Sequence, residues 1–358
     1  MASYRERVRQ DLERWIGAGL VPGENRDAIL ATLPQARRLD AATALAWVGG
    51  VLLGVAVISF VAANWDALAR AARFSLLLIA FLGFAGGAAW AAHRERDLLA
   101  NILLTVAALV FAAAIGLTGQ IFDIAGDPRA ASYAAGVAGF ALALAGRSTG
   151  AASVALTCIG LGDFTDRTWF AGADSDAPWL LIAAPLGAVL ALRWGSAALA
   201  HISAIAIITC CFWFAAHTDA DAAVFLFLAI VLSAMAGGAR WLSTQDRAFA
   251  SVFYGWFAFG ALVFFAVAGY LPLFGGEESG AANITHRIVW LAAAGGLVAL
   301  GRFDQHLMVT AIGVLGLIAA VCALLNDLGL NLLASAGVFF VCALAAMAAG
   351  LMLRRKAP

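Results

Sequence analysis

Two short polar stretches carry the residues of this chain that are best suited to bind a ligand. Their members are Asn64, Trp65, Asp66, Arg70 and Arg73 in the first, and Gln120, Asp123, Asp127 and Arg129 in the second. Carboxylate, amide and guanidinium groups can hold the polar part of a small solute or a lipid headgroup through charge-assisted hydrogen bonds. We name these nine residues the predicted polar site.

The same residues also allow a purely structural interpretation. Asp66 and Arg70 have the spacing of an ion pair within one helix, and Gly126–Asp127–Pro128 is typical of a turn that ends a helix. Tryptophan and charged side chains also anchor the ends of helices at a membrane surface. Spacing alone therefore leaves a binding site and a structural anchor both open.

The sequence contains no set of residues that would carry catalysis or hold a metal. Its five cysteines lack metal-binding spacing, and there is no catalytic triad order, phosphate loop or dinucleotide fingerprint. The connector at 163–178 holds Asp163, Asp166, Asp174 and Asp176, which we interpret as a solvated acidic loop because the spacing of a calcium loop is missing. We expect a protein that is not an enzyme and uses no cofactor and no metal.

The composition is that of a membrane protein. The chain has 358 residues, of which 63% are hydrophobic and 12% charged, with a mean hydropathy of +0.92. A soluble domain is only about half apolar, so much of this surface needs lipid as its solvent. The net charge of zero argues against nucleic acid as a partner and leaves membrane lipids as the expected one.

Twelve apolar segments follow the first 40 residues and predict an all-α bundle of about twelve transmembrane helices. They lie at about 41–63, 72–92, 99–118, 130–146, 149–163, 178–193, 197–216, 220–238, 248–271, 286–301, 306–325 and 329–353. A spanning helix needs about 20 residues, so the segments at 130–146, 149–163 and 286–301 are short. Ten or eleven true spans are therefore the alternative to twelve.

The distribution of positive charge predicts the orientation. With twelve spans, seventeen cations fall on the side of the termini and five on the other side. Cytoplasmic connectors are enriched in arginine and lysine, so we expect both termini in the cytoplasm. Arg70, Arg73 and Arg129 then lie against this trend, on the outer face beside the predicted polar site.

Few ionisable or packing signals stand out inside the spans. His201 and the pair His286–Arg287 lie at the ends of predicted spans, and we interpret them as side chains that reach the membrane surface. Gly50 with Gly54, and Gly83 with Gly87, have the GxxxG spacing of close helix contacts. We expect these glycines to pack helices within one bundle.

Residues 1–40 form a soluble segment before the bundle of residues 41–353, and residues 354–358 form a basic cytoplasmic tail. Tyr4, Val8, Leu12 and Trp15 recur at helical spacing, and a second short helix is expected from Asn25 to Leu33. This helical hairpin could dock a protein partner, or it could rest on the membrane or the bundle. No cleavable signal peptide is expected, because the first apolar run begins too far from Met1.

Three elements of the sequence together resemble a known family. They are Trp15–Ile16–Gly17–Ala18–Gly19–Leu20, the span end Ala62–Ala63–Asn64–Trp65–Asp66, and Gly119–Gln120–Ile121–Phe122 followed by Gly126–Asp127–Pro128. In this order they resemble the domain-of-unknown-function 2157 family of predicted bacterial membrane proteins, over roughly residues 10–150. The resemblance implies a multi-pass protein of the bacterial cytoplasmic membrane and brings no assigned activity with it.

These observations support one leading function and two alternatives. The leading hypothesis is a protein that binds or transports a small or lipidic solute at the outer-face polar site. The first alternative is a membrane scaffold or assembly factor that docks a partner through residues 1–40. The second is an enzyme acting on lipid-linked substrates with Asp66, Asp123 or Asp127 as base, which we disfavour because no nucleophile or metal ligand set accompanies them.

Overall fold

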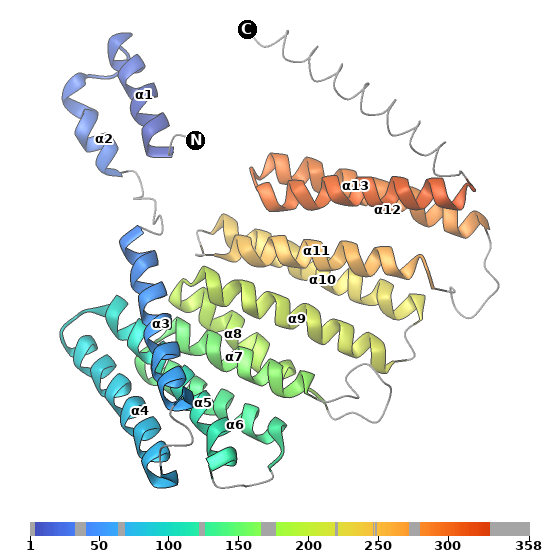
Figure 1. Cartoon of the computed structure of the whole chain (residues 1–358). Coiled ribbons are helices and arrows are strands. Elements are labelled where there is room, and N and C mark those ends of the chain that lie inside the picture. The colour runs from blue at the N-terminus through green and yellow to red at the C-terminus, as the bar shows by residue number, and fades with distance from the viewer. Residues whose placement is uncertain are drawn as a thin grey trace. The chain divides into compact units, whose positions relative to one another are not determined.

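The computed structural model describes residues 4–32, 41–63, 69–121, 126–165, 177–218, 221–245, 247, 249–271 and 280–329. Within these ranges the chain forms thirteen α-helices and one short 3₁₀ helix, with no strand (Figure 1). The all-helical prediction is therefore confirmed for this part of the chain. The chain divides into two compact units, Met1–Ala56 and Val57–Pro358.

The first unit begins with the two predicted helices. α1 spans Tyr4–Gly17 and α2 spans Arg26–Thr32, with the 3₁₀ helix Gly23–Asn25 directly before α2. Gly19 adopts a left-handed φ of +70°, which lets the chain turn after α1. Arg26 on α2 pairs with Glu13 on α1 at 2.8 Å, and Leu12 is buried while Trp15 is 47% exposed.

Eleven longer helices follow, and they match the first eleven predicted spans. They are α3 (Ala41–Ala63), α4 (Arg70–His93), α5 (Asp97–Ile121), α6 (Pro128–Gly146), α7 (Thr149–Phe164), α8 (Leu180–Trp194), α9 (Ala197–His217), α10 (Ala222–Thr244), α11 (Ala250–Ala268), α12 (Gly280–Phe303) and α13 (Leu307–Asp327). The twelfth predicted span, 329–353, lies outside the described residues beyond Gly329.

Seven of the described helices are long and apolar enough to cross a membrane. These are α4, α5 and α9 to α13, while α7 and α8 are shorter apolar helices. Large apolar side chains such as Ile79, Ile230 and Leu315 are 66%, 69% and 67% exposed. Such side chains on long apolar helices are stable only where lipid surrounds them, so the chain is a membrane protein with several apolar helices.

The start of α12 corrects the sequence-based prediction. The span expected at 286–301 was short for a membrane crossing, yet α12 is 24 residues long and its apolar span runs from Asn283 to Phe303. Arg287 is only 2% exposed because its Nε donates to Asp327 Oδ2 at 2.8 Å. A paired arginine can stay inside the protein, so the prediction that Arg287 reaches the surface was wrong.

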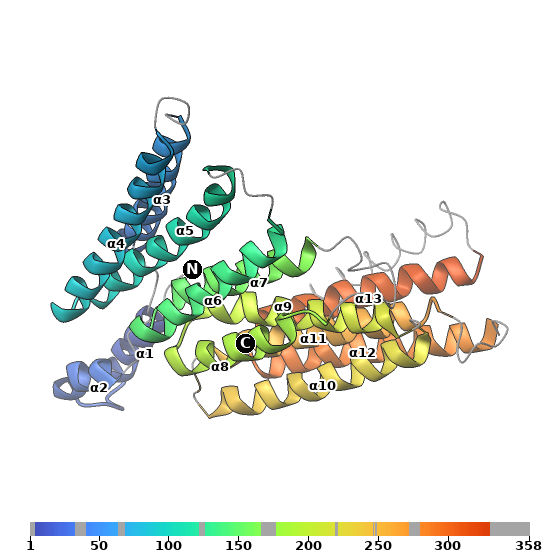
Figure 2. The same ribbon diagram turned by 90° about the horizontal axis from the view of Figure 1, so that it is seen from below.

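Helices that follow one another in the chain pack side by side. α4 lies along α5, α6 along α7, α10 along α11 and α12 along α13 (Figure 2). Three of the connectors contain a left-handed residue and then a residue that caps the next helix. Arg147, Gly195 and Gln305 have φ of 50°, 67° and 53°, and Ser148, Ser196 and His306 accept a hydrogen bond from the first turn that follows. This geometry reverses the chain within two or three residues.

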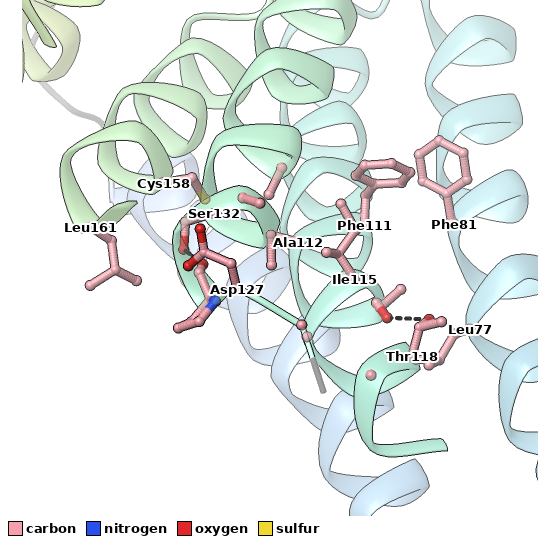
Figure 3. Close-up of a pocket in the computed structure, with 18 of the residues that line it drawn as sticks. Leu77, Phe81, Phe111, Ala112, Ile115, Thr118, Asp127, Ser132, Cys158 and Leu161 are labelled. Carbon is pink, nitrogen blue, oxygen red and sulfur yellow. Dashed lines mark hydrogen bonds between the residues drawn. The ribbon is translucent and has the colours of Figure 1, made fainter. Parts of the chain in front are cut away.

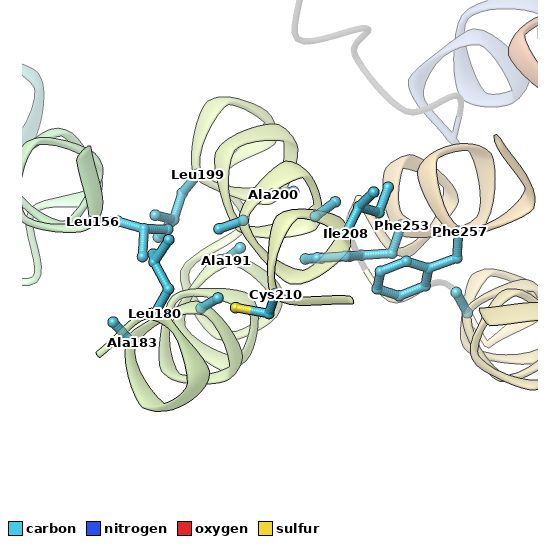
Figure 4. Close-up of a cluster of buried hydrophobic side chains, with 14 of the residues drawn as sticks. Leu156, Leu180, Ala183, Ala191, Leu199, Ala200, Ile208, Cys210, Phe253 and Phe257 are labelled. Atoms are coloured by element: carbon cyan, nitrogen blue, oxygen red, sulfur yellow. The ribbon is translucent and has the colours of Figure 1, made fainter. Parts of the chain in front are cut away.

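The largest core cluster draws on every helix from α4 to α11 and on the start of α13, and it consists mostly of small side chains. Ala183, Ala191 and Ala200 are almost fully buried, and Leu156, Leu199, Phe253 and Phe257 fill the spaces between helices (Figure 4). Alanine and glycine let helix backbones approach closely, which favours packing within a membrane, where the hydrophobic effect between helices is weak.

Two of the glycines predicted to pack closely, Gly83 and Gly87, make no tight contact. A Cβ on Gly83 would meet nothing within 4 Å, and one on Gly87 would make ordinary contact with Leu103 at 3.5 Å. A Cβ on Gly139 would instead lie 3.0 Å from the Cβ of Ala155, and one on Gly313 would lie 2.7 Å from the Val298 backbone nitrogen. The expectation of tight packing was therefore wrong at Gly83, because that side of α4 faces no neighbouring atom in the described residues.

A polar clamp ties the α12–α13 connector to α10 and α11. Arg240 donates two hydrogen bonds to Asp304, at 2.7 and 2.8 Å, and Tyr254 donates a third at 3.2 Å. The hydrogen bonds from Arg240 hold the pKa of the Asp304 carboxyl below its ordinary value, although partial burial acts the other way. This charge-assisted arrangement fixes one end of three helices together.

Candidate functional site

A cavity of about 830 Å³ lies among α4, α5, α6 and α7. Its walls are mainly apolar, with Phe74, Leu77 and Phe81 from α4 and Phe111 and Ile115 from α5. The rings of Phe81 and Phe111 lie 5.2 Å apart on one side, while Asp127, Ser132, Cys158 and Leu161 line the other (Figure 3). This volume lies within the range of cavities that hold small organic ligands.

The polar lining of the cavity comes mainly from the start of α6. Asp127 caps this helix, since its Oδ1 accepts a hydrogen bond from the Arg129 backbone nitrogen at 2.9 Å, and Pro128 occupies the first helical position. Gly126–Asp127–Pro128 was predicted to be a turn that ends a helix, whereas Asp127 and Pro128 begin one. Asp127 is exposed, so its carboxylate can accept further hydrogen bonds from a ligand in the cavity.

The structure describes only some residues of the predicted polar site. Asn64, Trp65, Asp66 and Asp123 lie outside the described residues, and Gln120 is described only as a position near the end of α5. Arg70 and Arg73 begin α4, directly before Phe74 of the cavity wall. Asp127 lines the cavity itself. The first turn of α4 and the start of α6 therefore both adjoin the same cavity.

The ion pair expected between Asp66 and Arg70 is not tested, because Asp66 lies outside the described residues. Ala69 is extended, with φ of −61° and ψ of 148°, and α4 begins only at Arg70. The pairing of Arg70 with Asp66 therefore stays a prediction.

Arg129 faces a network of polar side chains that the sequence did not predict. Its guanidinium carbon lies 6.0 Å from the centre of the Tyr133 ring, and Tyr133 donates to Asp163 Oδ1 at 2.7 Å. Asp163 also accepts hydrogen bonds from the backbone nitrogens of Trp179 and Leu180, at 3.1 and 3.0 Å. The Tyr133 ring stacks on Trp179 with centroids 5.0 Å apart.

The prediction that Asp163 belongs to a solvated acidic loop was therefore wrong. It is 2% exposed and joins the end of α7 to α6 and to the start of α8. Burial is tolerated because three hydrogen bonds satisfy the carboxylate. Gly162 leaves room for this contact, because a Cβ there would lie 2.6 Å from the Tyr133 ring. Asp166, Asp174 and Asp176 lie outside the described residues.

A second, smaller cavity of about 280 Å³ lies among α8, α9 and α10 beside Pro185. Its lining is apolar, apart from the thiols of Cys210 and Cys211. Among the described residues it has no charged group that could orient a ligand. The cavity of α4–α7 is the better candidate site because it combines apolar walls with a carboxylate.

Comparison with known proteins supports the membrane assignment. Residues 13–152 match the family model described as "Predicted membrane protein (DUF2157)". No curated protein and no solved structure matched the chain. The matched stretch includes α4, α5 and α6 and almost all residues that line the larger cavity. The resemblance to the domain-of-unknown-function 2157 family is therefore confirmed over residues 13–152.

Proposed function

We propose that this protein binds an amphipathic, lipidic solute in the cavity of α4–α7 and acts without catalysing a reaction. The observation that carries this proposal is the 830 Å³ cavity, with aromatic and aliphatic walls and a carboxylate at the start of α6. The apolar part of the solute lies against Phe74, Leu77 and Phe111. Its polar part lies near Asp127.

The polar end has to supply the selectivity. An acyl chain gains little by moving from a bilayer into an apolar cavity, because lipid tails are as apolar as the cavity wall. A hydrogen bond to the Asp127 carboxylate differs between headgroups, since only those with a donor or a positive charge can make it. This favours a solute with hydroxyl or amine groups in its polar part.

The orientation belongs to the same proposal. We propose twelve spans in a bacterial cytoplasmic membrane with both termini in the cytoplasm, supported by the distribution of arginine in the sequence. The start of α6 then faces outward. A solute could enter from the outer leaflet, between the first turns of α4 and α6. Transport across the membrane would be a further step after this binding.

A docking role for the N-terminal unit is the second candidate. Trp15 and Leu20 are 47% and 74% exposed in this unit, and exposed apolar side chains of this size are typical of contact surfaces. Deletion of residues 1–32 separates the two candidates. Solute binding should survive the deletion, whereas the recovery of a partner after cross-linking should be lost.

Filling the cavity tests the leading proposal. Ala112 and Ala131 line the cavity, whereas Ala141 is exposed on α6 and does not line it. We expect A112W and A131W, purified in mild detergent, to lose co-purifying lipid in native mass spectrometry, while A141W retains it. Equal lipid occupancy in all three variants and the wild type would contradict the proposal.

Changing the polar end tests selectivity. Asparagine can still cap α6, so D127N removes the charge and should keep the helix start. We expect D127N to bind lipids with amine or hydroxyl headgroups about tenfold more weakly, because a charge-assisted hydrogen bond is lost. The control is a diacylglycerol whose free hydroxyl is methylated and therefore has no donor. Its binding should be the same for D127N and the wild type.

A further inference from the structure

A second polar cluster lies where α11 ends, α12 begins and α13 ends. His286, Arg287 and Trp290 belong to the same turn of α12, and Arg287 and Trp290 are 2% and 5% exposed. Arg287 pairs with Asp327 on α13 through its Nε. Its guanidinium carbon also lies 4.2 Å from the centre of the Tyr270 ring, just after α11. Tyr270 is 58% exposed, so the cluster lies one side chain below the surface.

Three nitrogen atoms of this cluster have no hydrogen-bond partner among the described residues. They are His286 Nδ1, Arg287 Nη1 and Trp290 Nε1, and all three are buried. An unpaired polar atom in an apolar environment is destabilising by several kcal/mol. Three such atoms within one helical turn indicate that a polar ligand or water completes the cluster.

The hydrogen-bond directions restrict what this ligand can be. His286 Nε2 lies 2.9 Å from the Phe265 carbonyl oxygen, and because that oxygen only accepts, Nε2 carries the hydrogen. In the neutral ring Nδ1 is therefore an acceptor, and in the protonated ring it is a donor. Arg287 Nη1 and Trp290 Nε1 are donors in both states.

His286 and Arg287 direct these atoms toward the same place. The position that a Cβ would take on Gly269 lies 2.3 Å from His286 Nδ1 and 2.7 Å from Arg287 Nη1. The two nitrogens are therefore close enough for one small group to contact both. Any side chain at position 269 would press on them, which explains why the tight α11 end has glycine here.

The charges of the cluster decide between the two protonation states. Arg287 and Asp327 are the charged groups that act on His286 from α12 and α13, and together they balance. α11 and the residues after it contribute the Phe265 carbonyl and the Tyr270 ring. An added anion would leave one excess negative charge, which a proton on His286 compensates. That proton also turns Nδ1 into a third donor.

We propose that His286, Arg287 and Trp290 form a binding site for one anion, which enters together with a proton on His286. The anion is a free inorganic ion or the phosphate of a lipid headgroup, since both present oxygen or halide acceptors to the unpaired donors of this cluster. Affinity therefore rises as the pH falls through the titration of His286.

Thermal unfolding of the full chain in detergent tests this site. Sodium chloride is compared with sodium gluconate at about pH 5.5 and about pH 8, on either side of the ordinary imidazole pKa. We expect chloride near a hundred times its Kd to raise the midpoint by roughly 5 °C at the lower pH and by much less at the higher. In a second arm, phosphatidylglycerol is compared with diacylglycerol, which lacks phosphate.

Two variants and a control keep the test decisive. W290F retains the ring and removes only the unpaired N–H, and H286Q can still donate to Phe265. Both should lose most of the shift, while H217Q, at the end of α9, should keep it. A shift from phosphatidylglycerol alone identifies a lipid phosphate as the anion. The proposal is overturned if neither anion shifts the midpoint, or if W290F responds like the wild type.

Discussion

At the scale of single residues, the buried charges of this protein join the ends of helices. Asp163 is held by Tyr133 and by two backbone nitrogens at the start of α8, and Arg287 is held by Asp327 at the end of α13. Such a group is stable only with its partners. The free-energy cost of burying an unpaired charge is much larger than the net stabilisation that its hydrogen bonds or ion pair contribute. Removing one member should therefore have a large effect.

Asp163 provides the first test at this scale. D163A leaves the Tyr133 hydroxyl and the two nitrogens of α8 without an acceptor, and we expect it to lower the free energy of unfolding by about 3 kcal/mol. Y133F removes one of the three hydrogen bonds and should lower it by about 1 kcal/mol. Thermal or denaturant unfolding in detergent gives both values. A D163A effect no larger than that of Y133F would mean that Asp163 is not the centre of this network.

At the scale of elements, tight connectors and small residues together produce the close packing of consecutive helices. The connectors 94–96, 147–148, 195–196 and 304–306 each contain a residue with positive φ, and the predicted topology places all four on the cytoplasmic side. Short connectors force consecutive helices to lie together as antiparallel pairs. Small residues then let the members of a pair approach, as Gly136 and Gly139 do against α7.

A pair of glycine substitutions tests this packing. G139V places its side chain against Ala155, where even a Cβ would lie 3.0 Å from the Ala155 Cβ, and should lower stability by about 1–3 kcal/mol beyond the propensity cost. G83V carries the same propensity cost at a position with no atom within 4 Å of the added Cβ. The midpoint of thermal unfolding should fall clearly further for G139V. Equal decreases would show that α6 and α7 can separate without cost.

At the scale of the whole molecule, the membrane topology remains a prediction from the sequence. The arginine distribution places both termini in the cytoplasm, and each additional or missing span would move every later connector to the opposite side. The ends of α7 and α10 should therefore lie on opposite faces. Thr165 and Gln245 are exposed residues directly after these helices.

Cysteine labelling tests the topology. In a variant with the five native cysteines replaced by alanine, T165C should react with a membrane-impermeant maleimide added to intact spheroplasts. Q245C should react only after the membrane is opened. Labelling of both cysteines from the outside would require an even number of spans between them, instead of the three formed by α8, α9 and α10, and would overturn the twelve-span arrangement.

Much of the fold could be predicted because lipid imposes a simple rule on the sequence. A spanning segment must be apolar and helical, so the predicted span 41–63 and α3 have the same bounds, and the ends of most other helices differ by only a few residues. The rule fails where a polar group is satisfied inside the protein. Arg287 was expected to reach the membrane surface and Asp163 to lie in a solvated loop, because pairing cannot be inferred from composition.

The candidate site, too, was predictable only in part. The sequence by itself determined the class of protein, the positions of its apolar helices and the polar residues at the start of α6, because each depends on local hydropathy and turn chemistry. Only the tertiary structure decided that Asp127 lines a cavity with Phe74 and Phe111, and that Arg287 reaches Asp327 forty residues away. These contacts depend on which helix faces pack together, and near-uniform apolar helices carry little sequence signal for that choice.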